Sequence, residues 1–189
     1  MQAKWWWVPD ICTDQLESRL GVVIWVNFRP LLCGSTLIGA LCVQAAYAQY
    51  CVPGRVVDGD TFHFQRGAEL VKVRVVGFDA PERGQAYGRV ATAKLKELTQ
   101  AGADCDCFKT DKYGRSVCRV RVGGRNVAVT MLQEGLGCID PRFVGEDSQT
   151  DQQANAQALR SAQAARRGMW ADDAPMCGKE YRDTKRAKR

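Results

Sequence analysis

The chain has 189 residues, of which 46% are hydrophobic and 25% are charged, and its formal net charge is +6. This length allows one compact domain with a leader or a tail, and the composition is that of an ordinary globular protein. The single histidine, His63, excludes an H-E-x-x-H zinc site, and the lack of a G-x-S-x-G turn argues against a serine hydrolase triad. Acidic and basic residues balance in the first 48 residues, so the positive excess lies in the remainder and favours a polyanionic partner.

The first predicted element is a leader that covers residues 1–48. Residues 31–48 carry no charge, follow Arg29 and end in a small-x-small pattern, which is typical of a secretory signal cleaved after Ala48. An uncleaved membrane anchor is the alternative, although the apolar run is at the lower length limit for spanning a bilayer. Residues 1–25 contain acidic side chains and a tryptophan run that a signal does not need, so we hypothesise that translation starts at Val26. We expect the mature protein to be secreted or periplasmic.

Cysteine usage agrees with export. Of nine cysteines, six follow the proposed cleavage site: Cys51, Cys105, Cys107, Cys118, Cys138 and Cys177. An even number in an exported chain predicts disulfides, but the sequence cannot choose among the many pairings. We expect Cys51 and Cys177 to join the two ends of the mature chain. A zinc site near Cys105-x-Cys107 is the alternative interpretation.

Five strands are predicted after the leader. Alternating and Val-rich segments place them at residues 55–57, 61–65, 69–76, 105–108 and 117–122. The first two flank Asp58-Gly59-Asp60, which predicts a tight turn. His63 should be half exposed, because alternation points it away from the side occupied by Phe62 and Phe64.

Three helices are predicted at residues 88–100, 127–134 and 151–166. In the first helix we expect Val90, Ala91, Leu95 and Leu98 to face the core. Residues 179–189 are densely charged and lack an apolar period, so we expect a basic, disordered tail. Five short strands interrupted by a helix indicate an α+β, mainly β domain over residues 49–178, built as a five-stranded OB-type Greek-key barrel with three helices.

Polar residues suited to phosphodiester chemistry occur at strand ends and in loops. The carboxylates of Asp60 and Asp79, together with the carbonyl oxygen of Ala80, are candidate ligands for Ca²⁺, which prefers oxygen donors. Glu82 is a candidate general base that takes a proton from a nucleophilic water. Each segment alone would indicate only a turn or a surface ion pair, so the interpretation depends on their occurring together.

Two arginines complete this candidate site. Arg74 and Arg115 carry planar, permanently charged groups that match the non-bridging oxygens of a phosphate. With a cation beside them, they would stabilise charge that develops in the transition state, and no histidine would be required.

Three segments carry a family resemblance: residues 56–61 (VVDGDT), 74–82 (RVVGFDAPE) and 110–115 (TDKYGR). In these segments the sequence resembles the staphylococcal thermonuclease-like family. The resemblance implies an OB barrel with three helices that uses Ca²⁺ to hydrolyse DNA and RNA, leaving 3′-phosphate ends. By position it implies Asp60, Asp79 and Ala80 as metal ligands, Arg74, Glu82 and Arg115 as catalytic residues, and Lys112 and Tyr113 as substrate contacts.

Two departures from the family pattern concern the substrate. Ala80 replaces a threonine, which should matter little if only its carbonyl binds metal. The positions at which the family has two nucleotide-binding tyrosines are near Pro141 and Phe143 in this sequence. Because neither residue is a tyrosine, the base preference stays open. The leading hypothesis is an exported, monomeric nuclease that has no stable membrane association once the leader is cleaved. The alternative is an OB module that binds nucleic acid without cutting it.

Overall fold

The computed structural model describes residues 49–188, apart from the side chains of residues 142 and 143. The predicted leader, its cleavage and the start at Val26 lie outside the described residues, as does the side chain of Phe143. In the part of the chain that is described, every helix is too short or too polar to cross a membrane.

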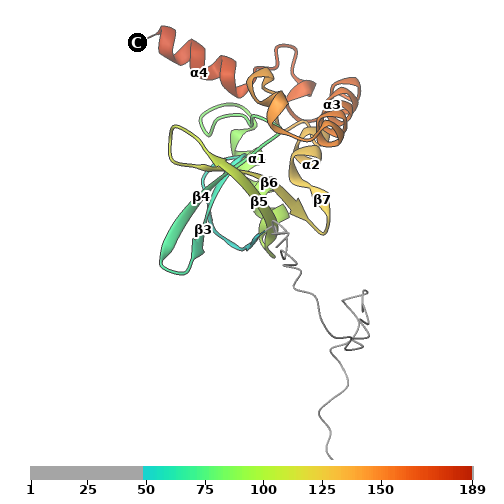
Figure 1. The fold of residues 1–189 in the computed structure, drawn as a ribbon. Helices are drawn as coiled ribbons and strands as arrows, with labels where there is room; N and C mark the ends of the chain where they lie inside the picture. Colours follow the sequence, from blue (N-terminus) through green and yellow to red (C-terminus); the bar gives the residue numbers. More distant parts are fainter. Residues whose placement is uncertain (1–48, 189) are drawn as a thin grey trace, which may run out of the picture. The chain divides into compact units, whose positions relative to one another are not determined.

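The domain is built on one strongly curled sheet (Figure 1). Its strands are β1 (Gln49–Cys51), β2 (Pro53–Val56), β3 (Thr61–Arg66), β4 (Glu69–Val75), β5 (Ala103–Thr110), β6 (Ser116–Val122) and β7 (Arg125–Asn126). The strand order is β1-β5-β6-β4-β3-β2, with β7 on β6, and only the β4–β6 pairing is parallel. The OB-type α+β fold is therefore confirmed, but the sheet has seven strands instead of five. The additional strands, β1 and β7, have three and two residues, too few to show an alternating pattern.

Alternation along β3 places the core. Phe62 and Phe64 are buried, whereas His63 between them is half buried, as the sequence predicts. Helix α1 (Gly88–Thr99) closes part of this core with Ala91 and Leu95. Val90 was expected to face the same way, but it is exposed, so the apolar face of α1 is narrower than predicted.

The other two predicted helices are also present and lie side by side in Figure 1. They are α2 (Val127–Gln133) and α3 (Gln149–Ala164), joined through the 3₁₀ helix η1 (Pro141–Glu146) and followed by η2 (Gly168–Ala171). Polar side chains start both α-helices: Asn126 accepts a bond from the amide of Ala128 at 2.9 Å, and Ser148 accepts one from that of Asp151 at 3.1 Å.

The prediction of a disordered tail is wrong, because α4 (Gly178–Ala187) forms a fourth α-helix. A capping box starts it, in which the carboxylate of Glu180 accepts from the amide of Cys177 at 3.1 Å. Lys179 and Asp183 add an i,i+4 ion pair at 2.6 Å. Gly178 is the only buried residue of this helix, and a helix without an apolar face gives no hydrophobic period to detect.

All six cysteines of the domain form disulfides: Cys51–Cys105, Cys107–Cys118 and Cys138–Cys177. The predicted oxidised state is thus confirmed, and the zinc alternative has no free thiol to use. The predicted Cys51–Cys177 pair is wrong. Cys51 ends β1, which pairs with β5 and brings Cys51 next to Cys105 instead. Cys177 is bonded to Cys138, so the disulfide fixes the start of α4 to the domain.

Candidate active site

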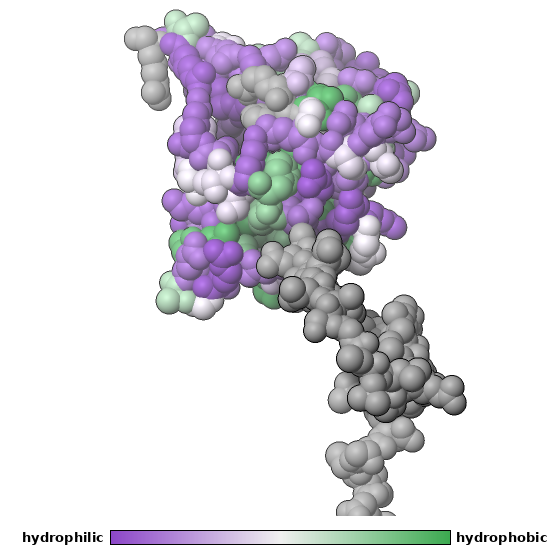
Figure 2. All heavy atoms as spheres, viewed as in Figure 1, coloured by the Kyte–Doolittle hydropathy of each residue, from purple (hydrophilic) through white to green (hydrophobic). Residues whose placement is uncertain are grey.

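The predicted site residues converge on one cleft with a volume of about 910 Å³. The acidic and basic residues on its lining include Asp58, Asp60, Arg74, Asp79, Glu82, Lys112, Arg115, Lys179, Arg182 and Arg186, and Ala80 and Tyr113 also contribute. Hydrophilic residues cover most of the face of the domain seen in Figure 2. Residues far apart in the sequence therefore form a single charged site.

Strand pairing brings the two aspartates together. Thr61 is opposite Arg74 in the β3–β4 ladder, and the amide of Val75 donates to the carbonyl of Asp60 at 2.9 Å. The carboxylate of Asp60 in turn accepts from the amide of Ala80 at 3.0 Å, which fixes the loop after β4 against the turn before β3. This close approach needs a glycine in the turn, because a Cβ at position 59 would lie 2.6 Å from the Cβ of Ala80.

Arg74 links both aspartates from the floor of the cleft. Its guanidinium lies 2.8 Å from Asp60 and 3.3 Å from Asp79, and it also donates to the carbonyls of Val75 and Phe78 at 3.0 and 3.1 Å. Only 8% of Arg74 is exposed. In this arrangement Arg74 holds the acidic residues in place, and a phosphate would reach it only from the open side of the cleft.

Three carboxyl groups, those of Asp58, Asp60 and Asp79, lie close together near Arg74, and this proximity affects the pKa values of Asp58 and Asp79. Burial and the neighbouring charge of Asp60 raise the pKa of Asp58 to about 7. Burial, reinforced by Asp60, also raises the pKa of Asp79, although Arg74 and Arg182 act in the opposite direction. Such an environment favours an additional cation.

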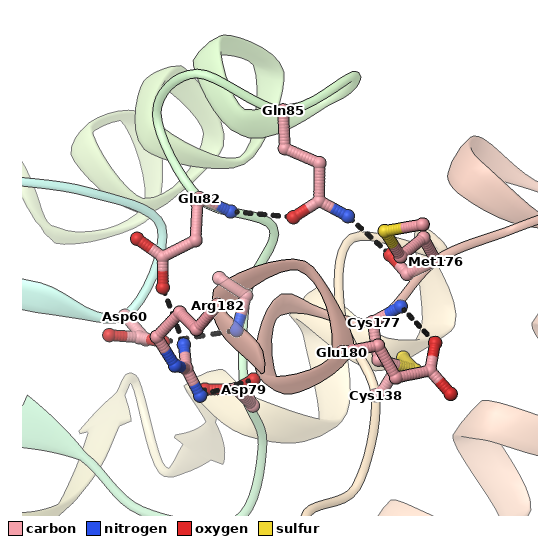
Figure 3. Close-up of a disulfide and its surroundings, with 10 residues drawn as sticks. Asp60, Asp79, Glu82, Gln85, Cys138, Met176, Cys177, Glu180 and Arg182 are labelled. Carbon is pink, nitrogen blue, oxygen red and sulfur yellow. Dashed lines mark hydrogen bonds and ion pairs between the residues drawn. A yellow bond between two sulfur atoms is a disulfide. The ribbon is translucent and has the colours of Figure 1, made fainter. Parts of the chain in front are cut away.

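Glu82 lies in the loop that follows Asp79. Its amide donates to the side-chain oxygen of Gln85 at 3.1 Å, and Gln85 donates onward to the carbonyl of Met176. The carboxylate of Glu82 points into the cleft and pairs with Arg182 (Figure 3). Glu82 and Asp79 are therefore linked through the same guanidinium group.

The 110–115 loop forms the opposite wall. Asp111 organises it by accepting from the amides of Tyr113 and Arg115 at 2.9 and 3.0 Å and by pairing with the Arg115 guanidinium at 2.7 Å. Tyr113 is largely exposed, and the charged groups of Lys112 and Arg115 lie 5.2 and 5.4 Å from the centre of its ring. Two cations and one aromatic ring thus face the cleft, a combination suited to a nucleotide phosphate and base.

The candidate metal ligands fit calcium in their donor chemistry. Asp60 and Asp79 provide carboxylates and Ala80 a carbonyl, all hard oxygen donors on the same cleft. The carboxylates are bonded to arginines, and within residues 49–188 no group of three or more His, Cys, Asp and Glu side chains is arranged around a metal position.

The sequence analysis missed the charged residues that α4 contributes to the cleft, among them Lys179, Arg182 and Arg186. Arg182, on α4, donates to both carboxylate oxygens of Asp79 at 3.0 and 3.1 Å and to Glu82 at 2.5 Å (Figure 3). Burial opposes its charge, but the bonds to Glu82 and Asp79 hold the pKa of Arg182 above its ordinary value. The only sequence signal was the density of charge after residue 178, which was interpreted as disorder.

The comparisons with known proteins identify the family of the chain. The model of the family described as staphylococcal nuclease homologue matches residues 72–172. A protein named uncharacterized endonuclease from Escherichia coli O157:H7 is 34% identical over 125 residues, which cover 65% of this chain and 77% of the relative. The micrococcal nuclease of Shigella flexneri is 32% identical over 128 residues, covering 62% and 71%. The chain belongs to the staphylococcal nuclease family.

Proposed function

We propose that this protein is an exported, calcium-dependent nuclease that hydrolyses phosphodiester bonds of DNA and RNA. The observation that carries the proposal is the convergence of Asp60, Arg74, Asp79, Glu82 and Arg115 on one cleft. The names of its relatives, endonuclease and micrococcal nuclease, support the same reaction class.

Each residue has a defined role in this proposal. Asp60, Asp79 and the carbonyl of Ala80 would hold Ca²⁺, which supplies positive charge beside the phosphate. Glu82 acts as the general base and takes the proton of the attacking water. Arg74 and Arg115 donate to the phosphate oxygens as their negative charge grows.

Substrate binding is assigned to the 110–115 loop. Lys112 neutralises a neighbouring phosphate and Tyr113 offers an exposed ring for a base. To bind a phosphate, Arg115 must exchange its bond with Asp111 for one with the substrate. This exchange needs little movement, because Arg115 and Asp111 both line the cleft.

Export is supported by the three disulfides, because disulfides persist mainly in secreted and periplasmic proteins. We therefore propose that the mature protein acts in the periplasm or outside the cell.

The test uses the purified, oxidised protein with single-stranded DNA and with RNA. Cleavage should require calcium and stop when a chelator is added. Glu82→Gln should lower kcat by roughly 10²–10⁴-fold, because it removes the proton acceptor without changing the size of the side chain. The matched control is Glu69→Gln on the exposed β3–β4 hairpin, which should cut at the normal rate. Substrate binding without cleavage by the wild-type protein would instead favour the non-catalytic binding module.

A further inference from the structure

We propose that α4 is an autoinhibitory element, in which Arg182 and Gly178 cover the oxygen atoms that would bind calcium, so that the cation must displace the helix to enter. The inference rests on the proposed function, because it assigns a second occupant to the same metal site.

The first observation is the position of the Arg182 guanidinium. It bonds both oxygens of Asp79 and one oxygen of Glu82, and only 4% of the Asp79 side chain is exposed. Both oxygens of this carboxylate are therefore already engaged by a positive charge. Arg182 thus provides the positive charge that a cation would otherwise bring (Figure 3).

The second observation concerns the start of the helix and does not depend on charge. Gly178 is buried against the carbonyl of Ala80. A Cβ built at position 178 would lie 2.4 Å from that carbonyl oxygen and 2.8 Å from the Oδ2 atom of Asp79. Two of the three candidate ligands are therefore covered by the first turns of α4, one by backbone and one by a side chain.

The third observation is how the helix is attached. Cys138 exchanges backbone bonds with Asp79 at 2.8 and 3.0 Å, and the Cys138–Cys177 disulfide joins this same point to the residue before Gly178. The tether keeps Arg182 at a high local concentration beside Asp79.

Gly178 is the one buried residue of α4. Beyond Gly178 its residues are exposed or half buried, and Tyr181 makes one bond to the carbonyl of Gly84, at 3.1 Å. A helix anchored at one end and largely solvated elsewhere can leave the site without exposing a hydrophobic core.

The consequence is a competition. Calcium and Arg182 bind the same carboxylate, so the apparent calcium affinity is reduced by the fraction of molecules in which α4 is seated. Once displaced, the helix leaves the cleft open to substrate.

The experiment measures calcium binding by isothermal titration calorimetry on the oxidised full chain without nucleic acid. Arg182→Met removes the guanidinium and Gly178→Ala pushes the helix away while keeping every charge. Both should tighten calcium binding, Arg182→Met by about tenfold or more, since it removes charge-assisted hydrogen bonds. Arg186→Met is the matched control, because Arg186 lines the cleft but pairs with Asp183 at 3.5 Å instead of with the ligands. Its calcium affinity should change much less.

Thermal unfolding provides the second readout and detects variants that fail to fold. Arg182→Met should melt at a lower temperature than wild type without calcium and gain more from added calcium, since at a given concentration a ligand that binds more tightly stabilises the native state more. If wild type binds calcium and both variants bind it no more tightly, the inference is overturned and the nuclease proposal stands. If neither wild type nor the variants bind calcium, both are overturned.

Discussion

The barrel and the C-terminal helix contribute to the same cleft in different ways. The barrel positions its residues by backbone pairing: the β3–β4 ladder, the Asp60–Ala80 bond and the buried Arg74 fix the acidic groups. Helix α4 contributes through one buried glycine, one disulfide and the charge of Arg182.

This difference separates a charged residue that is part of the barrel structure from one that a bound cation could replace. Arg74 is enclosed by the aspartates and by backbone carbonyls, and only 8% of it is exposed. The Arg182 side chain is 32% exposed and belongs to a helix in which only Gly178 is buried. The two arginines that contact Asp79 therefore differ in their setting: Arg74 is buried among the acidic residues of the barrel, whereas Arg182 reaches the site from a helix at its surface.

The largest expected effect is on stability and separates these two arginines. In chelator, Arg74→Met should lower the free energy of unfolding by about 3–5 kcal/mol, because it leaves buried carboxylates without a partner. Arg182→Met should cost about 1 kcal/mol, because its pair is partly solvated. Urea unfolding of both variants measures the difference. Equal losses would show that α4 is as much a part of the domain as the barrel floor.

The next effect compares two disulfides. Removing Cys138–Cys177 or Cys51–Cys105 by paired alanine substitutions should lower the free energy of unfolding by about 2–5 kcal/mol in each case. The closed loops are similar, with sequence separations of 39 and 54. Only the loss of Cys138–Cys177 should tighten calcium binding, because only that disulfide tethers α4. An equal gain after loss of Cys51–Cys105 would contradict the tether.

The smallest effect concerns the 110–115 loop, a weakly held part of the barrel itself. Burial acts to raise the pKa of Asp111, but bonds from Arg115 and Tyr113 hold it below the ordinary value of 3.8. The stabilisation is present above pH 3.8 and is lost as pH falls through the lowered pKa. At pH 6, Asp111→Asn should therefore lower the free energy of unfolding by less than about 1 kcal/mol and the melting temperature slightly. The difference in melting temperature between this variant and wild type should disappear in acid. A gap that widens in acid would show that the bonds favour the protonated form.

The alternation of apolar and polar residues along the sequence predicted the longer strands of the sheet and the residues that they bury. Alternation identified five strands and placed Phe62 and Phe64 inside, because a strand points successive side chains to opposite faces. The motifs around Asp60, Asp79 and Arg115 were recognised as one site, and the structure brings their residues to one cleft. The short strands β1 and β7 were missed because they exist only through pairing with β5 and β6.

The sequence by itself determined the barrel, its three core helices and the charged residues that the barrel contributes to the cleft. It also predicted disulfides, because the number of cysteines after residue 48 is even. Only the tertiary structure decided which cysteines meet, since a pairing depends on distances in space and not along the chain. The same holds for α4: a charged segment has no apolar face to indicate where it packs, and its place over Asp79 follows from the Cys138–Cys177 bond and the attraction between Arg182 and two carboxylates.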